Sequence, residues 1–127
     1  MIKPMAVKVL IKKDPRYPIN LKGVRRKIIE ILGDFGKKEK LEISLVFVGK
    51  RKAKELNENY RKMDYIPEVL AFPMNEVGPD GVIRLGDLVI CFPLAREVAI
   101  KREKLVDQVI FELLEHGIAN LVPGLNR

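Results

Sequence analysis

Residues 69–92 read VLAFPMNEVGPDGVIRLGDLVICF. Two apolar segments, 69–74 and 82–92, are rich in β-branched and aromatic residues, as strands are. The Pro-Asp-Gly at 79–81 lies between them. Proline sets the backbone angle that a turn requires and glycine tolerates positive φ, so these three residues indicate a tight turn. The stretch therefore predicts two strands that follow each other through a turn.

Upstream of this pair, strands and helices alternate. Residues 5–12 (MAVKVLIK) and 41–49 (LEISLVFVG) have the apolar, valine-rich pattern of strands. Residues 21–32 place their apolar side chains on one helical face and follow Asn20, a plausible N-cap. Residues 51–61 (RKAKELNENYR) form the second predicted helix.

Two helices are predicted downstream of the pair. Pro93 is well placed to begin a helix over 93–103. The last predicted helix covers 104–121, although no Gly or Pro marks the break between the two. The expected order is β-α-β-α-β-β-α-α. This order predicts an α/β fold, a small mixed sheet of about four strands with helices packed on it. We expect residues 1–127 to form one domain.

The composition is that of a globular protein, with 47% hydrophobic and 32% charged residues. The longest apolar run, ISLVFV, is too short to cross a bilayer, so we expect no membrane association. The first residues lack the pattern of a signal peptide, and the lone Cys91 cannot form an internal disulfide. These features predict a cytoplasmic protein.

Positive charge is concentrated in the first half of the chain. Residues 1–62 contain 18 Lys and Arg against 7 Asp and Glu, whereas residues 63–127 contain 6 against 10. A basic half favours a polyanionic partner, most commonly nucleic acid. The alternative is that these side chains serve solubility alone.

Several common sites are absent from the sequence. The VGKRK after the second predicted strand lacks the spacing of a phosphate-binding loop, and no G-x-G-x-x-G occurs. One histidine and one cysteine cannot build a zinc finger. Glu112 and Glu115 flank His116, and such a pair is typical of a solvated helix face.

The chain ends in HGIANLVPGLNR, residues 116–127. Asn120 follows His116, the single histidine, by four positions, so the two side chains share one helical face. One interpretation is a histidine at the edge of the core and an asparagine near the end of the helix. The other is a remnant of a metal site.

Three segments of the chain resemble the YbeY family of bacterial rRNA maturation factors, which are metal-dependent endoribonucleases. They are LNENYRKMDYIPEVLAFP (56–73), LGDLVIC (85–91) and LLEHGIANLVPGLN (113–126), in the order of the family motifs. The family fold is α/β. The resemblance implies a hydrolase that acts in 16S rRNA 3′-end maturation and ribosome quality control. Ribosomal RNA and the small ribosomal subunit or its proteins are the implied partners.

The resemblance also implies site residues. The family binds zinc through three histidines in H-G-x-x-H-x-x-G-x-D-H, and these positions fall on His116, Asn120 and Asn126. An arginine that is important for activity in the family falls on Arg61.

The donor chemistry predicts weak zinc binding, because an amide oxygen is a poorer zinc ligand than an imidazole nitrogen. Further ligands could come from Glu112, Glu115 or Asp87. Two functions remain open: an endoribonuclease with a weakened metal site, or a non-catalytic RNA- or ribosome-binding assembly factor that has kept the fold and lost the zinc site.

The basic half supplies candidate contacts to RNA phosphates, since Lys and Arg displace the counterions of a nucleic acid. The candidates are Arg25, Arg26, Lys27, Lys50, Arg51, Lys52, Lys54 and Arg61.

Overall fold

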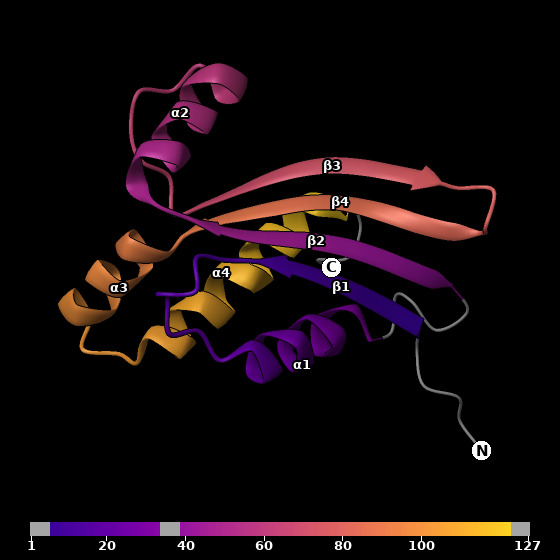
Figure 1. The fold of residues 1–127 in the computed structure, drawn as a ribbon, viewed down its shortest axis with the longest axis horizontal. Coiled ribbons are helices and arrows are strands. Elements are labelled where there is room, and N and C mark those ends of the chain that lie inside the picture. The colour runs from indigo at the N-terminus through magenta and orange to yellow at the C-terminus, as the bar shows by residue number, and fades with distance from the viewer. Residues whose placement is uncertain (1–5, 34–38, 123–127) are drawn as a thin grey trace.

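The computed structural model describes residues 6–33 and 39–122 (Figure 1). Helices and strands follow in the order predicted from the sequence. The strands are β1 (Ala6–Lys12), β2 (Lys40–Val48), β3 (Val69–Val77) and β4 (Val82–Cys91), and the helices are α1 (Leu21–Leu32), α2 (Lys50–Arg61), α3 (Phe92–Lys101) and α4 (Val106–Leu121). None of the helices within the described ranges is long and apolar enough to cross a membrane.

The four strands form one sheet in the order β1-β2-β4-β3. The pairs β1–β2 and β2–β4 are parallel, and β3 pairs with β4 antiparallel, so the predicted mixed sheet is confirmed. The predicted turn joins β3 to β4. Gly81 adopts φ +79° and its N–H donates to the Gly78 carbonyl at 3.0 Å. Strand β3 is an edge strand, because β4 is its one neighbour in the order β1-β2-β4-β3.

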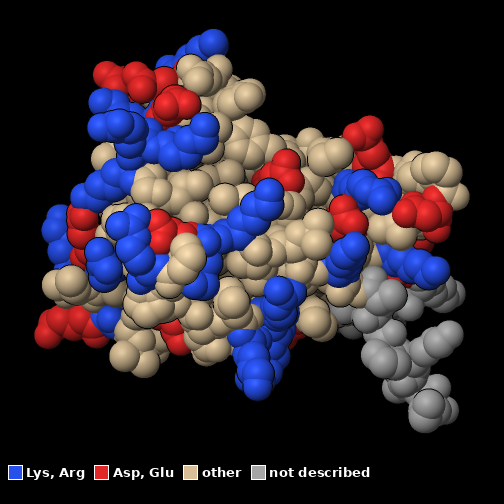
Figure 2. All heavy atoms as spheres, viewed as in Figure 1, with Lys and Arg blue, Asp and Glu red and all other residues tan. Residues whose placement is uncertain are grey.

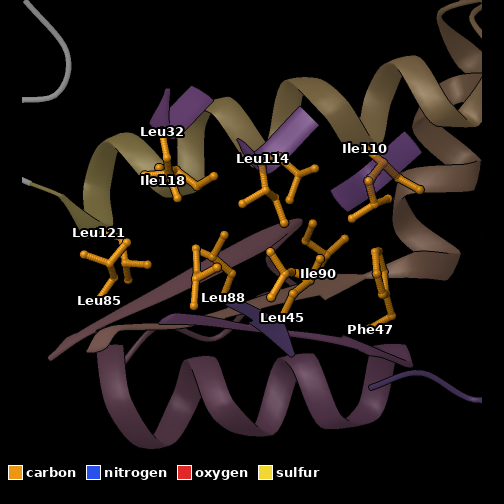
Figure 3. Close-up of a cluster of buried hydrophobic side chains, with 14 of the residues drawn as sticks. Leu32, Leu45, Phe47, Leu85, Leu88, Ile90, Ile110, Leu114, Ile118 and Leu121 are labelled. Atoms are coloured by element: carbon orange, nitrogen blue, oxygen red, sulfur yellow. The ribbon is translucent and has the colours of Figure 1, made fainter. Parts of the chain in front are cut away.

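The core lies between one face of the sheet and α4 (Figure 3). Residues of β2 alternate between buried and half-buried, as expected when one face of a strand packs inward. Leu45, Leu88 and Ile90 point from the sheet toward Leu114 and Ile118 of α4, and all five are fully buried. Burying one such side chain stabilises the fold by roughly 1.5–3 kcal/mol.

The helices occupy both sides of the sheet. Helix α1 packs against α4 on the core side, whereas α2 lies on the opposite side near one end of the sheet (Figures 1 and 3). Helices α3 and α4 pack against each other. Residues 62–68 lead the chain from the outer, carboxyl end of α2 back to the start of β3 (Figure 1).

Gly86 occupies an irregularity in β4, where the register with both neighbouring strands shifts. Its φ is +137°, and a Cβ atom added there would lie 2.3 Å from the carbonyl oxygen of Phe72. Only glycine fits this backbone conformation and this close approach.

The helix boundaries show what the sequence pattern detected and what it missed. Asn20 is the N-cap of α1, as predicted, and its Oδ1 accepts from the Gly23 N–H at 3.0 Å. The break between α3 and α4 falls at Glu103, which takes φ +53°. Its neighbour Lys104 donates its N–H to the Ala99 carbonyl at 2.9 Å, so a glutamate takes the left-handed position that glycine usually occupies.

Candidate functional site

Arg61 and His116 line the same two adjoining pockets. The first, which we call the edge pocket, has a volume of about 220 Å³. It is lined by Arg61, Val69, Leu70, Ala71, His116, Gly117 and Asn120. The second, the outer pocket, has a volume of about 470 Å³ and is lined by Arg61, Tyr65, Pro67, Glu68, Val69, Glu112, Leu113 and His116.

Gly117 brings α4 against the sheet at this site. A Cβ atom added to Gly117 would lie 3.0 Å from a methyl carbon of Leu88 and 3.2 Å from one of Val69. Both distances are shorter than ordinary van der Waals contact, so a side chain at this position would push the helix away from β3 and β4. The absence of that side chain sets His116 and Asn120 beside the edge strand, where both are exposed.

Arg61 is the last residue of α2. The helix ends there because Lys62 takes the left-handed φ of +59° and the Met63 N–H donates to the Asn57 carbonyl at 3.3 Å. The chain then turns toward β3. Arg61 is exposed, and within residues 6–33 and 39–122 no carboxylate lies within ion-pair distance of it.

Asn57 is a residue whose role the sequence analysis missed. It is the fully buried polar residue of α2, and its Nδ2 donates to the Tyr65 carbonyl at 3.0 Å. This bond fastens the segment between α2 and β3, which carries the Tyr65 and Pro67 walls of the outer pocket. The signal in the sequence was its place four positions after Ala53, which puts it on the same helical face as the other buried residue of α2.

Of the additional metal ligands considered from the sequence, Glu112 lines the outer pocket with His116, but its carboxylate and that of Glu115 are already paired with cations. The Glu112 carboxylate bonds to Arg102 at 3.1 Å and Lys104 at 2.6 Å. The Lys104 hydrogen bond lowers the pKa of Glu112, with desolvation opposing it and Arg102 adding to it. Glu115 pairs with Lys27 at 3.6 Å.

Asp87 lies on the other face of the sheet. It lines a groove of about 460 Å³ together with Val46, Leu56, Tyr60, Phe72 and Val89. Tyr60, which is 67% exposed, meets Phe72 edge to face with ring centroids 5.4 Å apart. These residues form a groove beneath α2 that is separate from the two pockets around His116.

The residues present do not fit a zinc ion. His116 offers one imidazole and Asn120 one amide, and a catalytic zinc needs about three good protein ligands. Across the described part of the chain, no group of three or more His, Cys, Asp or Glu side chains is placed to hold a metal. Asn126, the third expected ligand position, lies outside the described residues.

The candidate RNA contacts fall on two separate surfaces. Lys50, Arg51, Lys52, Lys54 and Arg61 belong to α2, whereas Arg25, Arg26 and Lys27 belong to α1 on the core side of the sheet. Figure 2 shows Lys and Arg side chains gathered over the α2 region and over the α1 region, with acidic side chains among them.

Several of these cations already have partners. Lys27 pairs with Glu30 and Glu115, Lys50 with Glu97, Lys52 with Glu55 and Lys54 with Asp64, and Arg25 donates to the Val9 carbonyl at 2.6 Å. Within the described ranges, Arg26, Arg51 and Arg61 have no ion-pair partner.

Comparison with known proteins identifies the fold and its relatives. A family model described as Endoribonuclease YbeY matches residues 11–122. The chain belongs to the YbeY family. An Endoribonuclease YbeY from Acinetobacter baumannii is 35% identical over 125 residues, which cover 93% of this chain and 79% of that protein. The corresponding protein of Chromobacterium violaceum is 37% identical over 81 residues, 63% of this chain and 48% of its own.

The solution structure of TM1509 from Thermotoga maritima has the same fold. It superposes with a TM-score of 0.61 at 23% identity and covers 89% of this chain and 71% of its own. Membership of the YbeY family confirms the resemblance seen in the three motifs, and the family is one of endoribonucleases. Asn120 is the position at which the resemblance of the motifs implies the family's second histidine.

Proposed function

We propose that this chain is a YbeY-type rRNA maturation factor that engages single-stranded RNA through the two pockets around Arg61. The observation that carries the proposal is that Arg61, His116 and Asn120, which come from two helices on opposite sides of the sheet, line one pocket. By the resemblance of the sequence motifs, these three residues correspond to the family's functional arginine and its first two metal ligands. The proposed substrate is the 3′ end of 16S rRNA, with a role in ribosome quality control in the cytoplasm.

The proposed endoribonuclease activity is weak and depends on metal added in excess. A metal ion in such a site would lower the pKa of a bound water toward neutrality. One imidazole and one amide among the described residues are a poor zinc site, so we derive no cleavage step through the metal.

The second candidate is a non-catalytic assembly factor that binds rRNA or the small ribosomal subunit. The specific observation in its favour is that Glu112 and Glu115 are paired with cations and Asp87 is on the other sheet face, so none of the three replaces a lost ligand. Arg61 and the other exposed arginines could still hold RNA by contacts to phosphate.

One set of experiments separates the two candidates. The purified protein is incubated with an RNA that contains the 16S 3′ end, with Zn²⁺, Mn²⁺ or Ni²⁺ or with a chelator. Metal-dependent cutting of this RNA, abolished in the Arg61→Ala variant, would support the endoribonuclease candidate. Salt-sensitive binding to RNA or to small subunits with no cutting at any metal concentration supports the assembly factor. Absence of both cutting and binding would overturn the proposal.

A further inference from the structure

We infer that the edge pocket binds a phosphodiester group of RNA directly, without a metal ion, and that the backbone N–H groups of Val69 and Ala71 are among its donors. The inference rests on the proposed RNA-directed function and specifies the chemistry of the same site.

The first step is the direction of the backbone of β3. The Cys91 N–H donates to the Glu68 carbonyl at 3.0 Å, and the register pairs Leu70 with Val89. In an antiparallel ladder, residues that bond to the partner strand alternate with residues that do not. Glu68 and Leu70 therefore turn their backbone groups toward β4, and Val69 and Ala71 turn theirs away from the sheet.

Pro73 supports this assignment independently. It lies two positions after Ala71 and pairs with Gly86, so it is one of the residues whose backbone groups turn away from β4. Proline has no N–H and is tolerated within a sheet where that group would face away from the partner strand. In the described part of the chain, no strand lies on the outer side of β3. The outward N–H groups of Val69 and Ala71 are consequently available to a ligand.

The second step is the set of side chains that surrounds these groups. The edge pocket contains the Arg61 guanidinium, the Asn120 amide and the His116 imidazole, and no carboxylate is among its lining residues. Arginine binds phosphate in a planar, bidentate geometry, and backbone N–H groups strengthen such contacts. Val69 and Ala71 turn their carbonyls outward as well as their N–H groups, so the backbone supplies both acceptors and donors. The fixed charge in the pocket is the Arg61 guanidinium, and this positive charge favours an anion over a metal cation.

The third step is size. A volume of about 220 Å³ is smaller than the pockets that enclose drug-sized ligands, which begin near 300 Å³. The edge pocket therefore suits a phosphate group, and the adjoining outer pocket of about 470 Å³, which shares Arg61, Val69 and His116, can receive the attached nucleotide. This geometry explains how the site can hold RNA after losing the family's second histidine.

The test uses the full chain labelled with nitrogen-15 in buffer that contains a chelator, titrated with inorganic phosphate and, separately, with a short single-stranded RNA. We expect saturable shifts of the Val69 and Ala71 backbone amides and of the Asn120 side-chain amide. The Leu70 amide, which bonds to β4, is the internal control and should move much less.

Variants sharpen the test. Arg61→Ala should weaken phosphate binding about 10- to 100-fold, because it removes charged hydrogen bonds. Lys101→Ala, which removes an exposed cation of α3, should not change phosphate binding. Ala71→Pro removes one outward N–H in a strand that already accepts Pro73, and we expect weaker phosphate binding with the spectrum of the folded protein retained. If Ala71→Pro unfolds the chain, the shifts of the Val69 and Ala71 amides in the parent protein still test whether phosphate binds there.

The outcomes distinguish this inference from the proposed function. RNA binding without shifts at Val69 and Ala71, or phosphate shifts confined to residues 50–54, would overturn the edge-pocket inference and leave the RNA-binding function standing. Phosphate binding at Val69 and Ala71 with no affinity for RNA would support the pocket and overturn the proposed function. A requirement for added zinc would overturn the metal-free inference.

Discussion

Arg61 and His116 lie on opposite layers of the fold and line the same two pockets. Arg61 is carried there by the end of α2, and His116 by α4, which approaches the sheet closely at Gly117. The edge strand β3 lies between them. The site is thus built where one helix ends, another crosses the edge of a sheet, and the backbone of an unpaired strand edge is exposed.

The first prediction concerns Arg61 and the salt dependence of RNA binding. Arg61→Ala should lower RNA affinity and reduce the slope of log K against log salt by about 1, as expected for one lost phosphate contact. Affinity is measured by fluorescence anisotropy over a series of salt concentrations. Lys52→Ala is the control, because Lys52 already pairs with Glu55 and should change the slope less. Equal slopes for both variants would argue against a special role for Arg61.

The second prediction restores the family's ligands. Asn120→His combined with Asn126→His should raise zinc affinity by orders of magnitude, because His116 and residue 120 are four positions apart on one helical face. Zinc uptake is measured by competition with a chromophoric chelator. Asn59→His, on the exposed surface of α2, is the control for a histidine placed elsewhere. Uptake no greater than that of the control would show that the ligand positions do not converge.

The third prediction compares two glycines with positive φ. Gly81→Ala should cost about 1–2 kcal/mol of the free energy of unfolding, because its φ is +79° but no atom lies within 4 Å of the added Cβ. Gly86→Ala should cost about 1–3 kcal/mol more, since its Cβ would also collide with the Phe72 carbonyl. Denaturant titration measures both. Equal losses would mean that the strand moves away from Gly86 without cost.

The fourth prediction concerns the buried amide of Asn57. Asn57→Ala should lower the free energy of unfolding by about 1–3 kcal/mol, because it leaves the Tyr65 carbonyl without its hydrogen bond. The same variant should weaken RNA binding, since that bond fastens a wall of the outer pocket. Asn59→Ala, an exposed position two residues further along α2, is the matched control. If Asn57→Ala loses stability but keeps its RNA affinity, the Asn57 hydrogen bond does not support RNA binding.

The fifth prediction is a pH dependence that arises from Glu112. Lys104, and then Arg102, hold the pKa of this carboxyl below its ordinary value of 4.5 in the folded state. The contribution to stability is therefore fully present above pH 4.5 and is lost as the pH falls through the lower folded value. The difference in unfolding free energy between the parent protein and E112Q should be constant near neutral pH and shrink in acid. A pH-independent difference for E112Q would contradict the prediction.

Local sequence patterns were sufficient to predict much of the fold. The element order, the Asn20 cap and the turn at Gly81 all depend on residues close together in the chain, so each is predictable from the sequence. The resemblance to the YbeY family rested likewise on short motifs in a fixed order, which a sequence displays directly. Neither required knowledge of which segments meet in space.

The remaining features are products of tertiary structure. The strand order β1-β2-β4-β3 makes β3 an edge, and this follows from how the helices cover the sheet rather than from the pattern of any one strand. Glu103 breaks a helix without glycine, and Asn57 is a polar residue that packing buries on α2. Whether a lysine is available for RNA depends on the carboxylate that folding brings to it, as Glu97 is brought to Lys50. The sequence determined which groups the site contains, and tertiary packing decided which of them meet, because hydrogen bonds, ion pairs and pockets join residues that are distant along the chain.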